Sequence, residues 1–173
     1  MRRFVSVLAG VFSVAVAVAA PRVAHAQLSV GGYAGAEFDN KDNWILFGGE
    51  ARLPLDKMIN KPVDANVRFT YHSYGSGYSV TQLDFNALHN LVLAKPGLFA
   101  PYVGLGAAWI HASGSGASEN KAGLNLITGT KLVFDPKSRV QPFVNTQYTI
   151  ARDWGNSYTL TVGLSFKLGT AGK

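Results

Sequence analysis

The residues best suited to chemistry are a histidine and a serine two positions apart, His111 and Ser113. A histidine in reach of a serine is the arrangement that activates a hydroxyl as a nucleophile, provided that an acid orients the histidine. The nearest acid in sequence is Glu119, and Ser113 opens a Gly/Ser-rich stretch typical of a loop. We therefore predict that the chain is not an enzyme and keep this pair as an alternative.

Metal and phosphate chemistry have less support. The chain has no cysteine, and none of His72, His89 and His111 sits at a spacing typical of a metal site. The glycine pairs at 104/106 and 114/116 lack the third glycine, the lysine and the helix start of a phosphate-binding loop. No metal or cofactor is expected.

Charged residues in the middle of predicted strands form a second candidate site. Because unpaired charges are costly away from water, a matched set predicts a neutralised network inside the protein. We expect Arg68 and Lys131 to lie among Glu50 and Asp84. The acids and bases that share the inward parity are Glu37, Glu50, Asp64, Asp84, Arg52, Arg68, Lys131 and Lys167.

The elements that hold these residues begin after an expected export signal, residues 1–26. It has charged, apolar and small-residue regions in secretory order and ends at Ala24-His25-Ala26. An uncleaved anchor is the alternative. Cleavage after Ala26 would leave one domain, 27–173, and 13 of the 16 Lys and Arg residues against 10 acids. This excess of +3 does not indicate nucleic acid as a partner.

Alternation with period two dominates from residue 28 onward, in segments long enough to cross a bilayer as tilted strands. The fold prediction is all-β: an eight-stranded antiparallel up-and-down transmembrane β-barrel after an N-terminal signal peptide. The predicted strands are 28–38, 44–55, 63–74, 80–93, 98–110, 121–134, 139–151 and 157–168.

One parity of these strands is apolar, as at Val67 and Leu164, and the other is polar or small. A soluble barrel of the lipocalin type would alternate in the same way. Mid-strand charges and two bands of aromatic residues near the strand ends favour the membrane interpretation. The first band is Phe38, Trp44, Tyr71, Trp109, Tyr148, Trp154 and Tyr158, and the second is Phe99, Phe134 and Phe166.

An even number of strands puts both termini on the periplasmic side. The expected outward loops are 39–43, 75–79, 111–120 and 152–156, all short. Turns with Pro and Asp at 56–62, 94–97 and 135–138 face the periplasm.

The stretch Pro101-Tyr102-Val103-Gly104-Leu105-Gly106, after 82–87, resembles the outer-membrane β-barrel superfamily of OmpX-, OmpW- and opacity-type proteins. The resemblance covers residues 27–173 and implies a Gram-negative outer membrane. It also implies as partners the outer-membrane lipids, lipopolysaccharide, periplasmic chaperones and the barrel-assembly machinery. His111 and Ser113 resemble the pair of lipid A deacylases, without that family's longer signature.

The last predicted strand resembles the barrel-assembly signal, polar-x-Gly-x-x-aromatic-x-hydrophobic. Thr161, Gly163, Phe166 and Leu168 fill its four positions, although residues 169–173 follow instead of the usual terminal aromatic.

Eight strands enclose room for packed side chains or one small ligand. We predict a barrel with a side-chain-filled lumen and a structural or surface-interaction role. The alternatives are a narrow pore or carrier for small apolar solutes, by analogy with OmpW-type barrels, and a lipid A-modifying enzyme using His111 and Ser113.

Overall fold

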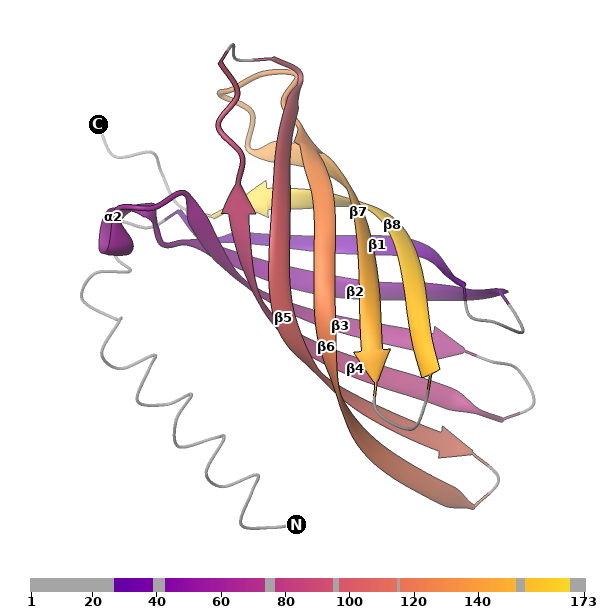
Figure 1. The fold of residues 1–173 in the computed structure, drawn as a ribbon. Coiled ribbons are helices and arrows are strands. Elements are labelled where there is room, and N and C mark those ends of the chain that lie inside the picture. Colours follow the sequence, from indigo (N-terminus) through magenta and orange to yellow (C-terminus); the bar gives the residue numbers. More distant parts are fainter. Residues whose placement is uncertain are drawn as a thin grey trace.

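The computed structural model describes residues 27–38, 43–73, 77–94, 97–114, 116–151 and 155–168. They form one closed antiparallel barrel in which each strand pairs with its neighbours in sequence, and β1 pairs with β8 (Figure 1). The elements are β1 (Ser29–Phe38), β2 (Asn43–Pro54), α2 (Asp56–Ile59), β3 (Val63–Ser73), β4 (Ser79–Asn90), β5 (Phe99–Gly114), β6 (Ala117–Leu132), β7 (Val140–Ala151) and β8 (Gly155–Lys167). The predicted eight-stranded antiparallel up-and-down barrel is confirmed.

Closure depends on the seam between the first and last strands. β1 and β8 pair without interruption from Ser29↔Lys167 to Phe38↔Tyr158. A closed barrel has no free sheet edge, so its backbone N–H and C=O groups satisfy one another, as a strand protein needs in lipid. We call the end with Ser29 and Lys167 the terminal end, and the end with Gly114 and Ala117 the hairpin end.

The two faces of the wall differ as the alternation predicts. Apolar side chains of one parity point away from the axis, as with Ile45 at 76% exposed and Leu105 at 64%. The other parity is buried although it is polar, and Asp84 is 0% exposed. The barrel therefore has a polar interior and an apolar exterior, the reverse of a soluble barrel.

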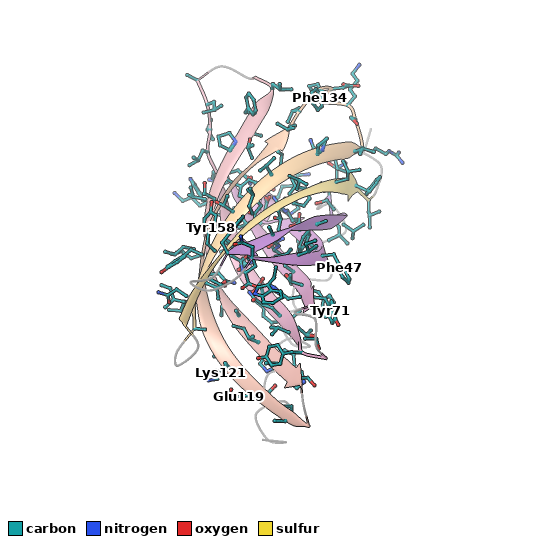
Figure 2. The ribbon with its side chains drawn as sticks, turned by 90° about the vertical axis from the view of Figure 1, so that its right-hand side faces the viewer. Phe47, Tyr71, Glu119, Lys121, Phe134 and Tyr158 are labelled. Atoms are coloured by element: carbon teal, nitrogen blue, oxygen red, sulfur yellow. The ribbon has the colours of Figure 1, made fainter. Side chains whose placement is uncertain are left out.

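Aromatic residues lie on the exterior near both ends. The rings of Phe38 and Tyr158 are 6.2 Å apart at the hairpin end, and Phe134, at the opposite end, is 71% exposed (Figure 2). Trp44 departs from the expected band, because it shares the inward parity of Leu46 and Glu50. Trp154 lies outside the described residues.

The predicted loop 111–120 is wrong. β5 and β6 continue through it, pairing His111↔Asn120 and closing at Gly114↔Ala117. Gly116 has φ +83°, a left-handed conformation that glycine adopts without strain, and it completes the tight turn. The sequence of this hairpin resembles a loop because Gly and Ser are poor strand formers, but the backbone pairing overrides that preference. β8 likewise begins at Gly155, inside the predicted loop 152–156.

Short connections close the terminal end. α2 forms one turn after β2. Asn60, which caps its C-terminus, has a left-handed backbone conformation with φ 53°. Between β6 and β7, the side chain of Asp135 accepts a hydrogen bond of 2.8 Å from the Lys137 backbone N–H, as expected for an Asp turn. β4 ends at Asn90, three residues earlier than predicted.

Among the described residues, no helix has the length and hydropathy needed to span a membrane. The expected signal 1–26 and the tail 169–173 lie outside these residues.

Candidate functional site in the polar lumen

A carboxylate and a guanidinium from one strand form a two-point ion pair in the lumen. Glu50 and Arg52 are two residues apart on β2, so strand alternation sends both side chains inward. Arg52 Nε donates to Glu50 Oε1 at 2.6 Å, and Nη2 donates to Oε2 at 3.1 Å. Both side chains are almost completely buried. The two-point geometry is the strong form of such a pair.

Two aromatic rings enclose the same guanidinium. Its carbon lies 4.6 Å from the ring centre of Tyr102 and 5.1 Å from that of Phe143. Arg52 Nη2 also donates to the Tyr102 hydroxyl at 3.0 Å, and that hydroxyl donates to Asn145 Oδ1 at 3.2 Å. Ring faces attract cations, which compensates in part for the lost hydration of the guanidinium.

Inward-facing glycines make room for these rings. A Cβ at Gly129 would lie 2.5 Å from the Tyr102 ring, and one at Gly163 would lie 2.5 Å from the Phe143 ring. Each glycine is on a strand adjacent to its aromatic residue. The two large rings can therefore pack against these glycines inside the lumen.

Arg68 joins the network from β3. Its Nε lies 3.8 Å from Glu50 Oε2, and its guanidinium carbon lies 4.3 Å from the ring centre of Tyr33. Nη1 donates to Gln147 Oε1 at 3.0 Å, and Nη2 donates to Thr161 Oγ1 at 3.3 Å. Arg68 thus shares Glu50 with Arg52 and reaches across to β7 and β8.

Asp84 is held by amides. Gln82 Nε2 and Asn125 Nδ2 donate to its Oδ1 at 2.7 and 2.9 Å. Gln147 Nε2 donates to Oδ2 at 3.3 Å. Arg68 and Asp84 are opposite each other on β3 and β4, and Gln147 bridges them with its two polar atoms. Side-chain amides can join an acid to a base because they donate and accept at once.

Further amides link the two central acids. Asn66 donates to Glu50 at 3.4 Å, Asn86 donates to Asn66 at 3.0 Å, and Asn125 donates to Asn86 at 3.2 Å. Since Asn125 also donates to Asp84, the hydrogen bonds run from one carboxylate to the other. The buried polar groups of the central lumen form one connected network.

Lys131 does not join Glu50 and Asp84 as expected. Its Nζ lies 2.9 Å from Asp64 Oδ2, and Asn90 Nδ2 donates to the other oxygen of Asp64 at 2.9 Å. The register explains the difference, because Asp64 is opposite Pro54, at the terminal end of β2, and Lys131 is opposite Ala100, near the start of β5. These charges form a separate pair toward the terminal end.

A second separate pair lies toward the hairpin end. His72 Nδ1 is 2.6 Å from Glu37 Oε2, and both residues are buried. Between this pair and the central network, the structure leaves a void of about 10 Å³, next to Arg68, His72 and Gln82. That is about the room of one water molecule. The described lumen is therefore filled by side chains.

Solved structures share this architecture at low sequence identity. Neisserial surface protein A has a TM-score of 0.63 at 14% identity, over 83% of this chain and 97% of that one. The N-terminal β-barrel domain of Pseudomonas aeruginosa OprF has a TM-score of 0.57 at 17% identity, over 83% of this chain and 99% of that one. The Yersinia pestis outer membrane protein Ail in a phospholipid bilayer nanodisc has a TM-score of 0.52 at 14% identity, over 82% of this chain and 99% of that one. The chain has the fold of small outer-membrane barrels.

Neither the protein-family models nor the curated proteins gave a match to this sequence. The resemblance found at residues 101–106 is confirmed as a resemblance of fold. A small outer-membrane barrel of this kind presents three places where function could reside: the lumen, the lipid-facing wall and the loops at its ends.

The outer wall of the barrel carries His111 and Ser113, the pair kept as an alternative catalytic site, and the geometry does not support catalysis. His111 and Ser113 take the outward parity, and His111 Nδ1 lies 2.8 Å from the amide oxygen of Asn120. The ring of His111 stacks on the ring of Trp109, and the two ring centres are 5.9 Å apart. Glu119 instead binds Lys121 Nζ at 3.0 Å. The carboxylate that should orient the histidine is thus bound to a lysine.

The described residues contain no group of three or more His, Asp or Glu side chains arranged to hold a metal ion.

At the hairpin end, burial raises the pKa of the Tyr78 hydroxyl, and the nearby carboxylate of Glu119 raises it further.

Three positions of the predicted assembly signal lie on β8, and Leu168 directly follows that strand. Thr161 is buried and donates to the backbone oxygen of Asn145 at 3.3 Å, while Gly163 faces Phe143. Phe166 and Leu168 are exposed on the outer wall, at 45% and 46%. The assembly role of these positions stays a prediction.

Sequence reasoning named the charged members of the lumen and missed its aromatic ones. Tyr33, Tyr102 and Phe143 are inward-facing, but their hydrophobic character gave no reason to separate them from the outer wall. Strand parity was the available signal, because Tyr102 shares parity with Gly104 and Gly106. The bridging role of Gln147 could not be predicted, since it depends on contacts across the lumen.

Proposed function

We propose that this protein is a bacterial outer-membrane barrel with a closed lumen and a structural or surface-interaction role, without catalytic activity. The filled lumen is the observation that carries the proposal. Arg52 and Arg68, the rings that flank them and the amide network occupy the centre of the described lumen, and the void beside them measures about 10 Å³. A barrel filled in this way has no continuous water path for ions or solutes.

The exterior supports the membrane location. Large apolar side chains are exposed around the whole wall, among them Phe47, Phe69, Leu124 and Val162, each at least 50% exposed. A soluble monomer rarely exposes so much contiguous apolar surface, because it drives association in water. Outer-membrane lipids are the partner that this surface fits. Export by residues 1–26 and insertion by the assembly machinery, with periplasmic chaperones, belong to the same proposal.

Conductance of purified protein in liposomes tests the closed lumen. We expect currents at background, with a 16-stranded porin in the same liposomes as the conducting control. Large, steady and ion-selective currents would show that the lumen is open and would favour the narrow pore.

A carrier with a lateral opening has less support. Such a path needs a gap between two strands, and the seam between β1 and β8 is paired along all of β1. The described residues show continuous pairing at the other strand contacts too.

The hairpin end favours the surface-interaction half of the proposal. β5 and β6 pair up to Gly114↔Ala117, whereas the pairing of β6 with β7 stops at Gly123↔Ala151. The hairpin therefore projects beyond that neighbour (Figure 1), and residues 117–120 are exposed. The hairpin therefore presents two paired strands to the surroundings of the barrel.

The absence of cysteine allows a direct test of orientation. Ser118→Cys places a single thiol on the hairpin, and Ser138→Cys places one in the turn between β6 and β7. On intact cells, we expect a membrane-impermeant maleimide to label Ser118→Cys, and to label Ser138→Cys only after lysis. Equal labelling of both on intact cells, or recovery in the soluble periplasmic fraction, would contradict the proposed location.

A further inference from the structure

The terminal end carries an excess of positive charge. Two of its basic residues, Lys137 and Arg139, are in the turn between β6 and β7, and the backbone N–H of Lys167 on β8 donates to the Arg139 carbonyl at 2.8 Å. Lys57 and Lys61 are on the connection between β2 and β3. Among the described residues, the exposed carboxylates of this end are Asp56 and Asp135, so the four exposed bases, Lys57, Lys61, Lys137 and Arg139, outnumber two acids.

Two of these bases, Lys137 and Arg139, lie at the border of the apolar wall. Arg139 directly precedes Val140, which is 39% exposed, and Lys137 follows Phe134, which is 71% exposed. If the apolar wall lies in the hydrocarbon layer, cations at its border are at the depth of the lipid headgroups, where they meet phosphate groups.

The hairpin end differs. Its described charges pair with one another: Glu119 with Lys121 at 3.0 Å, and Glu37 with His72 at 2.6 Å. Figure 2 shows Glu119 and Lys121 at the end opposite Phe134. The charge asymmetry between the two ends thus comes from the terminal end.

We propose that the terminal end binds the phosphate groups of anionic phospholipids in the leaflet that it faces. This inference rests on the proposed function, which places that end on the periplasmic side and the hairpin end toward lipopolysaccharide. Arg139 is the central contact, because a guanidinium can bind two phosphate oxygens at once. Lys137 acts beside it as a point charge.

Spin-labelled lipids test the proposal. The purified protein is inserted into vesicles of phosphatidylcholine, with and without added phosphatidylglycerol, and the motionally restricted fraction is measured for a spin-labelled form of each lipid. We expect phosphatidylglycerol to be preferred about fivefold at low salt, the factor associated with one basic side chain near an anionic surface. High salt should reduce the preference toward parity, because it screens exposed charges.

Charge reversal at the two ends supplies the matched comparison. Arg139→Glu should lose most of the preference and Arg139→Gln part of it, whereas Lys121→Glu, the same reversal at the hairpin end, should retain it. Equal association of both lipids with the wild type, or an equal loss in Lys121→Glu, would overturn the inference. Heat-modifiable migration on gels reports insertion separately. Failure to insert into either vesicle would overturn the proposed function and this inference with it, while insertion without preference overturns this inference alone.

Discussion

Two ion pairs with the same spacing occupy opposite surroundings in this barrel. Glu50 and Arg52 are two residues apart on β2, and Glu119 and Lys121 are two residues apart on β6. The first pair has side chains 1% and 3% exposed, and the second has 58% and 15%. Their closest distances, 2.6 and 3.0 Å, are similar.

Distance alone therefore does not rank these pairs. In the lumen, each partner depends on the other for solvation, and removing one leaves a buried charge. At the hairpin end, water solvates Glu119 whether or not Lys121 is present, so the pair contributes little. With the same spacing, the Glu50–Arg52 pair stabilises the interior, whereas the Glu119–Lys121 pair contributes little at the surface.

The largest effect is expected from Arg52→Met. This change leaves Glu50 buried with Arg68 at 3.8 Å as its remaining cation, and an unpaired buried charge costs about 3 to 5 kcal/mol. Urea unfolding in detergent or lipid measures it, and adding Glu50→Gln should restore part of the loss. Arg68→Met should also destabilise, by less than Arg52→Met, because Arg52 makes the shorter contacts. Unchanged stability in both single variants would contradict the charge-paired lumen.

The next largest effect is expected from a cation placed on the apolar exterior of the wall. Leu164 is on β8 opposite Gly32 of β1 and is 46% exposed on the exterior. Leu164→Arg should cost about 2 to 4 kcal/mol near the bilayer midplane, as should Val67→Arg. The lumen change Asn145→Ser should be mild. Refolding titrations that show equal tolerance on both faces would indicate a soluble barrel.

Tyr102→Phe isolates the hydroxyl from the ring. The ring stays over Arg52, but the hydrogen bonds of the hydroxyl to Arg52 and Asn145 are lost. A hydrogen bond to a charged group contributes about 1.5 to 3 kcal/mol. The unfolding midpoint in urea should fall accordingly, by less than for Arg52→Met. A loss as large as that of Arg52→Met would mean that the hydroxyl, rather than the carboxylate, governs the site.

The smallest effect is expected from Glu119→Gln. Exposed pairs contribute about 0.2 to 1 kcal/mol, so the unfolding midpoint should barely change. A loss comparable to that of Arg52→Met would show that the hairpin pair supports the barrel.

Strand β3 and the hairpin of β5 and β6 show where sequence prediction was accurate and where it was not. Strand 63–73 ends within one residue of its predicted boundary, because its alternation is strict and ends at small and turn-forming residues. The hairpin was predicted as a loop, because its Gly and Ser residues resemble a turn. Pairing between two long neighbouring strands decided its structure, and that pairing depends on register.

Strand parity was a property of the sequence alone. Successive side chains of a strand point to opposite faces, so the alternation placed Glu50, Arg68, Asp84 and Lys131 on the inner face without any knowledge of the partner strands. Only the tertiary structure decided which charges meet. Lys131 binds Asp64, which is 67 residues away, and Arg68 reaches Gln147, which is 79 residues away. Those contacts depend on strand stagger and barrel closure, which set the depth of each side chain in the lumen, and alternation carries no information about depth.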